Sequence, residues 1–468
     1  MTSLLEALAA IVGADAVLQD PQERADLGTD RCRGRWPVAP LAIVRPGSVA
    51  EVSAVVRAAA AAGAAIVPSG GRTGLCGGAT ATAGELVVSL DRMRRILAID
   101  PAARVLRCEA GATVEAVQQA AAAHGLLYPV DFAAKGTAQI GGSISTNAGG
   151  VKVLRYGTTR AWVSGVGVVL ASGEYVELGG ALVKDNTGYD LRQLFIGAEG
   201  TLGLVVDATL RLTQPPAGAV VAWLAVPDDA AIVALFDRVQ RAVTLQAFEY
   251  LEHGCLHHVL AHRGREGHGP FATPSHAYVL LEAELGAAES TESLRDRLVE
   301  CFAAAADAGE IDDAVVATSA TQARELWALR EDVSESLHRH RPHKNDIALP
   351  LVRVPEFLAA WRPLVASLLP GAVALSFGHV GDGNLHLNVL PPASLDGDAF
   401  LRACEAYDEA TYALVEQHEG SISAEHGIGL LKRRHLRHSR SVAELAMMRA
   451  IKQALDPNGL FNPGKILG

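Results

Sequence analysis

The sequence has few cysteines, and they are not spaced for a disulfide scaffold. Six cysteines are too few to form a disulfide scaffold in a chain of 468 residues, and no two of them form a CxxC pair. The six are Cys32, Cys76, Cys108, Cys255, Cys301 and Cys404. Reduced thiols indicate a cytoplasmic protein. The opening stretch MTSLLEALAAIVGADAVLQD lacks the basic start of a signal peptide, and no apolar run approaches the length of a bilayer span. We therefore expect a cytoplasmic location and no transmembrane segment.

The sequence also lacks an excess of positive charge. It has 41 Lys and Arg against 52 Asp and Glu, a formal net charge of -11. Binding to nucleic acid or to an anionic membrane needs a concentrated basic surface, so both partner classes are disfavoured and small-molecule chemistry is the default. The length exceeds that of one ordinary core and predicts two or three domains.

Short β-rich runs alternate with helical ones from residue 41 onward, beginning with a β-α-β pattern in LAIVRP, SVAEVSAVVRAAAAAG and AAIVPSGG. Glycine is dense between residues 141 and 203. The prolines of TQPPAG (residues 213–218) end a strand and precede a second mixed α/β region. We therefore predict domains at residues 1–216, 217–420 and 421–468, the last being a helix followed by a Pro/Gly-rich tail.

The stretch VPSGGRTGLCGG (residues 67–78) follows a strand-like run. Its five glycines could turn several backbone N–H groups toward a phosphate. It is neither a P-loop, because GK[ST] is missing, nor the GxGxxG dinucleotide fingerprint. From this loop alone, a cofactor site and a plain surface turn are equal alternatives.

Two further glycine-rich stretches, YPVDFAAKGTAQIGGSISTNAGGVKVLRYGTTR and DNTGYDLRQLFIGAEGTLGLVV, would suit a groove for an extended dinucleotide. Together with the loop they resemble the FAD-binding domain of the vanillyl-alcohol oxidase and p-cresol methylhydroxylase superfamily. Within it, the chain looks most like the FAD-linked D-2-hydroxyacid dehydrogenases. The resemblance implies an α+β fold: a two-subdomain FAD-binding domain, an α+β substrate (cap) domain and a C-terminal helical segment that returns to the FAD domain.

The resemblance also implies the FAD contacts. The pyrophosphate would be cradled by Pro68, Ser69, Gly70, Gly71, Arg72, Thr73, Gly74 and Leu75. The flavin and its adenosine tail would be lined by Pro129, Asp131, Thr137, Gly141, Gly142, Ser145, Asn147, Gly150 and Tyr156, and the adenine end by Gly197, Glu199, Gly203 and Val205. Asn462 and Lys465 of the tail are further cofactor contacts or, equally, parts of a packed turn. Relatives with covalent flavin often carry a histidine in the phosphate loop, so we expect noncovalent FAD here, with Cys76 a small packed residue.

The stretch LSFGHVGDGNLHLNV (residues 375–389) joins two apolar runs at Gly-Asp-Gly-Asn and predicts a β-hairpin. His386 and Asn388 are two apart and so share one strand face, and cross-strand pairing could bring His379 beside them. Further on, SISAEHGIG contains Glu425 and His426. Two histidines and a carboxylate suit Zn²⁺ or another divalent ion, although each histidine alone is more typical of a hydrogen-bonded turn residue.

The resemblance carries roles onto these residues. His379, His386 and Glu425 would bind a divalent metal, Zn²⁺ or alternatively Mn²⁺, and His426 would be the general base, with Asn388 positioning substrate or flavin. Arg330 and Ser334 are four apart, which places them on one face of an expected helix, and Lys344 follows beyond a proline. By pattern these three are a solvated helix end. By resemblance they bind the second carboxylate of a substrate.

The activity that the resemblance implies is the metal-assisted oxidation of D-2-hydroxyglutarate to 2-oxoglutarate, with hydride transfer to flavin N5. One alternative is a D-lactate, D-malate or other D-2-hydroxyacid dehydrogenase on the same scaffold. Another is a flavin-binding electron-transfer subunit of a larger complex. The sequence leaves the electron acceptor open, an electron-transfer flavoprotein or a quinone being examples, and leaves the oligomeric state open, a homodimer included.

Overall fold

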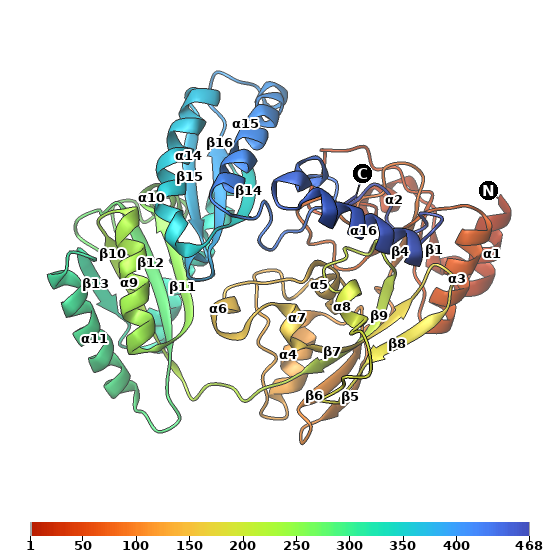
Figure 1. Cartoon of the computed structure of the whole chain (residues 1–468), viewed down its shortest axis with the longest axis horizontal. Coiled ribbons are helices and arrows are strands. Elements are labelled where there is room, and N and C mark those ends of the chain that lie inside the picture. The colour runs from red at the N-terminus through yellow and green to blue at the C-terminus, as the bar shows by residue number, and fades with distance from the viewer. Residues whose placement is uncertain (1, 468) are drawn as a thin grey trace. The chain divides into compact units, whose positions relative to one another are not determined.

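The computed structural model of the chain describes residues 2–467 (Figure 1). Two compact units divide it. The first comprises Met1–Gly150, Gly157–Pro215 and Glu425–Gly468, and the second comprises Val151–Tyr156 and Pro216–Ala424. Both mix helices and strands, which confirms the α+β class. Within residues 2–467, no helix combines the length and apolar character needed to cross a membrane.

The first unit contains two sheets. A four-stranded sheet has the order β1-β2-β4-β3, in which β2, β3 and β4 are parallel; its strands are β1 (Val17–Leu18), β2 (Ala42–Val44), β3 (Ile66–Ser69) and β4 (Leu86–Ser89). An antiparallel sheet has the order β5-β6-β9-β7-β8, with β5 (Ile96–Asp100), β6 (Val105–Glu109), β7 (Val163–Val169), β8 (Tyr175–Gly179) and β9 (Leu204–Arg211). The predicted β-α-β pattern corresponds to β2, α3 (Val49–Ala61) and β3.

Besides its strands, the first unit contains helices, and several of them contribute buried side chains to its apolar core. They are α1 (Thr2–Val12), η1 (Ala14–Ala16), α2 (Pro21–Leu27), α4 (Val114–Ala122), α5 (Ile140–Thr146), α7 (Thr159–Trp162), α8 (Arg192–Phe195), η4 (Arg433–His438) and α16 (Val442–Leu455). After α16 the tail returns to the edge of β3, where Ile66 N donates to Leu460 O and Asn462 N donates to Ile66 O, each at 2.7 Å. This pairing ties the C-terminal segment to the first unit.

The second unit is built on an antiparallel sheet of order β13-β10-β12-β11-β15-β16-β14. Its strands are β10 (Ala219–Val226), β11 (Thr244–Glu252), β12 (Ala277–Glu284), β13 (Asp313–Val316), β14 (His343–Ala348), β15 (Val373–Gly378) and β16 (Asn384–Leu390). One face packs on α10 (His253–His262), α12 (Ala320–Glu331) and α13 (Val333–His338) through a buried apolar cluster. The other elements are α6 (Val153–Tyr156), α9 (Asp229–Ala242), α11 (Thr291–Asp307), η2 (Leu351–Arg353), α14 (Val354–Leu368), η3 (Val380–Asp382) and α15 (Gly397–Gln417).

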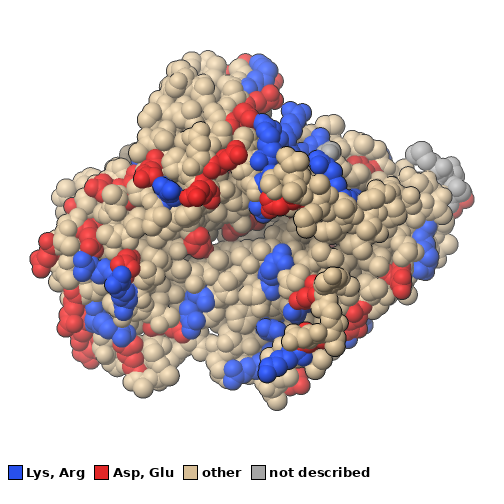
Figure 2. Space-filling view, viewed as in Figure 1, with Lys and Arg blue, Asp and Glu red and all other residues tan. Residues whose placement is uncertain are grey.

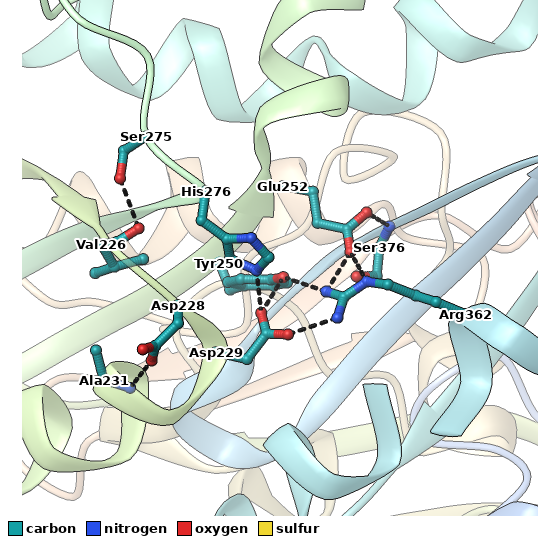
Figure 3. Close-up of polar contacts among 10 residues, drawn as sticks. All are labelled: Val226, Asp228, Asp229, Ala231, Tyr250, Glu252, Ser275, His276, Arg362 and Ser376. Carbon is teal, nitrogen blue, oxygen red and sulfur yellow. Dashed lines mark hydrogen bonds and ion pairs between the residues drawn. The ribbon is translucent and has the colours of Figure 1, made fainter. Parts of the chain in front are cut away.

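An ion network fixes α9 and α14 on the opposite face of this sheet (Figure 3). Arg362 of α14 donates to Asp229 Oδ2 at 2.6 Å and to Glu252 Oε1 at 2.6 and 2.9 Å. Tyr250 donates its hydroxyl to Asp229 at 2.9 Å, and His276 Nε2 lies 3.0 Å from the same carboxylate. One guanidinium therefore joins two carboxylates from different elements.

The predicted single helix carrying Arg330 and Ser334 is wrong. Helix α12 ends at Glu331, Asp332 interrupts it, and α13 begins at Val333. Asp332 accepts a hydrogen bond from Arg263 Nε at 2.6 Å, a tertiary contact at the interruption. Arg330 is buried, whereas Ser334 on the next helix is exposed.

One segment departs from the acidic balance of the chain. Residues 432–440 contain five of the 41 Lys and Arg residues and no Asp or Glu. Figure 2 shows Lys and Arg side chains gathered beside α16. Part of this charge is used internally, because Lys432 is buried and Arg433 donates to Gly464 O at 2.6 Å.

Candidate active site

The glycine loop begins where β3 ends, at the carboxyl edge of the parallel strands, which is where ligands bind to open parallel sheets. Gly71 must be glycine, because a Cβ there would overlap the carbonyl oxygen of Thr137. Arg72 adopts φ 56°, a left-handed conformation that turns the backbone. The loop therefore folds tightly against the segment that precedes α5.

Polar atoms beside this loop fit a bound phosphate group. Ser69 Oγ and Gln139 Oε1 are buried and have no hydrogen-bond partner within residues 2–467. Such orphaned polar atoms are uncommon in a folded protein and indicate a partner such as a ligand or water. At Gly142 on α5 a Cβ would meet nothing within 4 Å, so the backbone there borders open space. This cradle fits the pyrophosphate of FAD.

Arg72 is held in place by a carboxylate. Its Nη1 lies 3.2 Å from Asp91 Oδ2, and Gln139 Nε2 donates to Asp91 Oδ1 at 2.8 Å. Burial alone would raise the pKa of Asp91, but the Arg72 charge and these hydrogen bonds hold it below its ordinary value. The ionised Asp91 orients the arginine predicted to bind the phosphates.

Several other predicted cofactor residues have structural contacts. On α5, Ser145 Oγ donates to Gly141 O at 2.7 Å, and Asn147 caps the helix with φ 50° and accepts from Arg160 N at 2.9 Å. Asp131 pairs with Lys135 at 2.7 Å. Val205 lies in the core, Leu75 is 36% exposed, and Tyr156 lies on α6 in the second unit.

Glu199 and Cys76 anchor the loop that carries the EHGIG motif. The buried Glu199 carboxylate accepts hydrogen bonds from Ile428 N and Gly429 N, each at 2.7 Å. Burial is the main cause that raises the pKa of Glu199. The Cys76 thiol donates to His426 O at 2.9 Å and is 3% exposed, so it packs against this loop. Burial raises the pKa of this thiol well above its ordinary value, which opposes thiolate chemistry.

The tail residues lie against the same loops. Asn462 Nδ2 donates to Gly78 O at 2.9 Å and to Glu199 O at 2.7 Å. Lys465 Nζ is buried 3.9 Å from Glu85 Oε1 and makes no hydrogen bond to any described residue. Burial lowers the pKa of Lys465 to about 8. The tail thus places Asn462 against Gly78 of the glycine loop and buries the Lys465 ammonium near Glu85.

In the second unit, the predicted hairpin is present as β15, η3 and β16. Strand register places Asp346, His386 and Phe377 in one cross-strand row, and Lys344, Asn388 and Leu375 in the next row on the same face. His386 Nδ1 lies 3.6 Å from Asp346 Oδ1. The His379 and His386 rings are 5.3 Å apart between centroids. Two imidazoles and a carboxylate therefore gather on one sheet face, a donor set that suits a divalent cation.

A second carboxylate, that of Glu249, contacts the Nδ1 atom of His379. Glu249 on β11 is 1% exposed, and its two oxygens lie 2.8 and 2.9 Å from His379 Nδ1. Arg330 Nη2 lies 2.8 Å from Glu249 Oε2, and its guanidinium stacks over the Phe377 ring at 4.9 Å. Burial would raise the pKa of Glu249, but the charges of His379 and Arg330 lower it.

Lys344 is exposed on β14 opposite Asn388, and it is the only lysine between residues 216 and 424. Asn388 donates to His386 O at 3.3 Å. Lys344 and Asp346 are two residues apart on β14, and two strand residues span about 6.8 Å. This separation is roughly the length of a short dicarboxylate. Ser334 lies on α13, beyond the helix interruption.

Glu425 and His426 stand at the point where the chain enters the first unit. Ala424, the last residue of the second unit, donates its N–H to Asp346 Oδ2 at 3.1 Å. Glu425 follows one peptide bond later, so its Cα lies about 3.8 Å from that of Ala424. His426 Nε2 lies 3.6 Å from Glu425 Oε1.

The sequence prediction missed Asp346 and Glu249. A signal for Asp346 existed in KNDIALP, because an aspartate that directly precedes the apolar run Ile-Ala-Leu is costly to bury without a partner. Asp346 is fully buried and accepts from Asn384 Nδ2 at 2.8 Å. Glu249 in QAFEYLE carries a similar but weaker signal.

Two known protein families match most of the chain. Residues 40–179 match the FAD binding domain, and residues 215–466 match the FAD linked oxidases, C-terminal domain. The D-2-hydroxyglutarate dehydrogenase of Xanthomonas citri pv. viticola is 46% identical over 447 residues, 96% of this chain and 93% of that protein. The D-2-hydroxyglutarate dehydrogenase of Stutzerimonas stutzeri is 44% identical over 464 residues, 99% and 98% of the two chains.

Solved structures agree on the fold. p-Cresol methylhydroxylase matches with a TM-score of 0.77 at 16% identity, covering 99% of this chain and 96% of that one. 4-Ethylphenol oxidase from Gulosibacter chungangensis matches with a TM-score of 0.78 at 16% identity, covering 100% and 97%. With the family matches and the near full-length relatives, these findings show that the chain belongs to the FAD-linked oxidase family, with the fold of the vanillyl-alcohol oxidase and p-cresol methylhydroxylase proteins.

Proposed function

We propose that this chain is an FAD-dependent, metal-assisted D-2-hydroxyglutarate dehydrogenase, which oxidises its substrate to 2-oxoglutarate. The observation that carries the proposal is the pair of cross-strand rows in the second unit, with imidazole and carboxylate donors in one row and Lys344 with Asn388 in the next. Relatives at 46% and 44% identity bear this enzyme's name, which supports the same substrate here.

FAD would accept the C2 hydride at N5, and a divalent cation would acidify the substrate hydroxyl. FAD would be held noncovalently by the glycine loop, because the Cys76 thiol is turned to His426 O. His379, His386 and Glu425 would hold the cation, Zn²⁺ or Mn²⁺, with Asp346 beside His386 as an added carboxylate. The hydrogen bond from Ala424 to Asp346 supports the inclusion of Glu425, since it fixes the residue just before it.

The chain's own groups bind the substrate and move one proton. His426 would take the hydroxyl proton, and its neighbour Glu425 would favour the resulting cation. Asn388 would position the substrate beside His386. Arg330 and Lys344 would bind carboxylates, the lysine taking the distal one, and Ser334 would contribute its hydroxyl from α13.

The metal is tested by anaerobic flavin reduction with D-2-hydroxyacids, with and without a chelator. D-2-hydroxyglutarate should bleach the flavin, and the chelator should abolish the reaction. Unchanged bleaching after chelation would refute the metal. If no D-2-hydroxyacid bleaches the flavin, the chain is not a dehydrogenase of this class. The alternative function, a flavin-binding electron-transfer subunit of a larger complex, would then be favoured.

The substrate is tested with Lys344→Ala. Losing a charge-assisted bond of about 1.5–3 kcal/mol should lower kcat/KM for D-2-hydroxyglutarate by roughly 10- to 100-fold and leave D-lactate turnover unchanged. Arg353→Ala removes a half-exposed cation of the same unit and is the matched control. Intact D-2-hydroxyglutarate turnover in Lys344→Ala would contradict the dicarboxylate assignment.

A further inference from the structure

One buried carboxylate contacts both halves of the proposed site. Glu249 is 1% exposed, and its oxygens bind His379 Nδ1 at 2.8 and 2.9 Å and Arg330 Nη2 at 2.8 Å. His379 is a proposed metal ligand, and Arg330 is a proposed carboxylate-binding residue. Both partners are themselves largely buried, at 8% and 6% exposure.

The contact to His379 determines which ring nitrogen can bind a metal. When Nδ1–H donates to a carboxylate, the lone pair lies on Nε2, and the ring orientation is fixed. Carboxylates that hold ligating histidines in this way typically change metal affinity by 10- to 100-fold when removed.

The contact to Arg330 determines where that guanidinium lies. The ion pair and the Phe377 ring hold it from two sides. Arg330 Nε and Nη2 are buried and make no hydrogen bond with the described residues, the contact of Nη2 to Glu249 being an ion pair, so the fixed fork still has donors to offer. A carboxylate of the substrate is the complementary acceptor.

We infer that Glu249 is a positioning residue that orients His379 for the metal and Arg330 for the substrate carboxylate, so that one group sets the geometry of both binding sites. The inference rests on the proposed function. It predicts that a change at Glu249 weakens metal and substrate together, although this side chain need contact neither.

Glu249→Gln tests this with little change in size. The substitution removes the negative charge that faces both neighbours and replaces one oxygen by an NH₂ group. His379 Nδ1 lies 2.8 and 2.9 Å from the two oxygens, so in either amide orientation the NH₂ group faces this ring nitrogen. Glu249→Asp keeps the charge but withdraws it by one methylene, so it should give an intermediate effect. It also serves as the test if Glu249→Gln does not fold.

The matched control lies three residues further along the same strand. Glu252 is also buried and paired with an arginine, but it points to the opposite sheet face, where it binds Arg362 (Figure 3). Glu252→Gln should lower thermal stability and leave Zn²⁺ affinity unchanged.

The experiment measures Zn²⁺ binding to metal-stripped, FAD-loaded protein by competition with a chromophoric chelator, together with thermal stability and FAD content. Substrate KM is measured after Zn²⁺ saturation. Glu249→Gln should raise the Kd for Zn²⁺ by about 10- to 100-fold and raise the KM, with FAD content unchanged. A wild-type Kd in both Glu249 variants would overturn the inference, as would an equal rise in Glu252→Gln. Failure of the proposed metal site itself would be distinct, since His386→Ala would then bind Zn²⁺ like the wild type.

Discussion

The network around Arg362 allows a stability prediction for Arg362→Met. The substitution keeps the aliphatic stem and removes the cation between Asp229 and Glu252, whose side chains are 10% and 11% exposed. Removing one partner of a buried ion pair costs about 3–5 kcal/mol. Water reaches 29% of the Arg362 side chain, which lowers the expectation to about 2–4 kcal/mol of unfolding free energy.

The stability difference between wild type and Arg362→Met should depend on pH through the Asp229 carboxyl group. Burial raises the pKa of Asp229, but Arg362 and then His276 hold it below its ordinary value. A carboxyl group with a depressed folded pKa contributes stability above its unfolded pKa, and that contribution is lost as the pH falls through the folded value. The difference between wild type and Arg362→Met should therefore be full at pH 7 and shrink below about pH 4.

The assay is urea unfolding followed by circular dichroism, from pH 8 down to about pH 2.5, so that it spans the titration of Asp229. Arg241→Met is the control, because its pair with Asp237 on α9 is exposed and should be worth at most about 0.5 kcal/mol. If Arg362→Met loses no more stability than this control at pH 7, the network does not hold α9 and α14 to the sheet. A further variant, Arg362→Met with Asp229→Asn, should recover part of the loss by removing one stranded charge.

Three further predictions concern the metal, FAD and the C-terminal tail. His386→Ala should lose metal, measured by elemental analysis, and keep FAD; parallel loss of both would contradict the separate sites. Gly71→Ala should be isolated without FAD, because the new Cβ overlaps Thr137 O; full flavin absorbance would refute the close approach. Lys465→Met should stabilise the apoprotein at pH 7 by about 2–4 kcal/mol, because burial holds the folded pKa of the ammonium at about 8, well below its unfolded value. The unfolding free energy of the wild type should approach that of Lys465→Met as the pH rises from 8 to 10.5. If urea unfolding gives the same difference between the two proteins at pH 7 and at pH 10, the buried charge of Lys465 is not the cause.

Local patterns made parts of this molecule predictable. The hairpin of His379 and His386 depends on a turn inside fifteen residues, and the β-α-β unit depends on periodicity within residues 41–71. Asp346 and Glu249 were missed because their partners come from other strands, Glu249 lying 130 residues from His379. Spacing alone describes an uninterrupted helix, so it could not reveal the break at Asp332, which carries a contact from a distant arginine.

Alternate residues of β11 face opposite sides of the sheet, so the residues beside the proposed site and those of the Arg362 network lie on different faces. Glu249 and Leu251 face α12 and the proposed site, whereas Tyr250 and Glu252 face the Arg362 network. Each face therefore has its own buried carboxylate with its own arginine. A charge-neutralising change on one face should alter metal and substrate binding, and the same change on the other face should alter the free energy of unfolding. Because a one-residue slip of β11 would exchange the two faces, both ion networks also favour the native register over its neighbours.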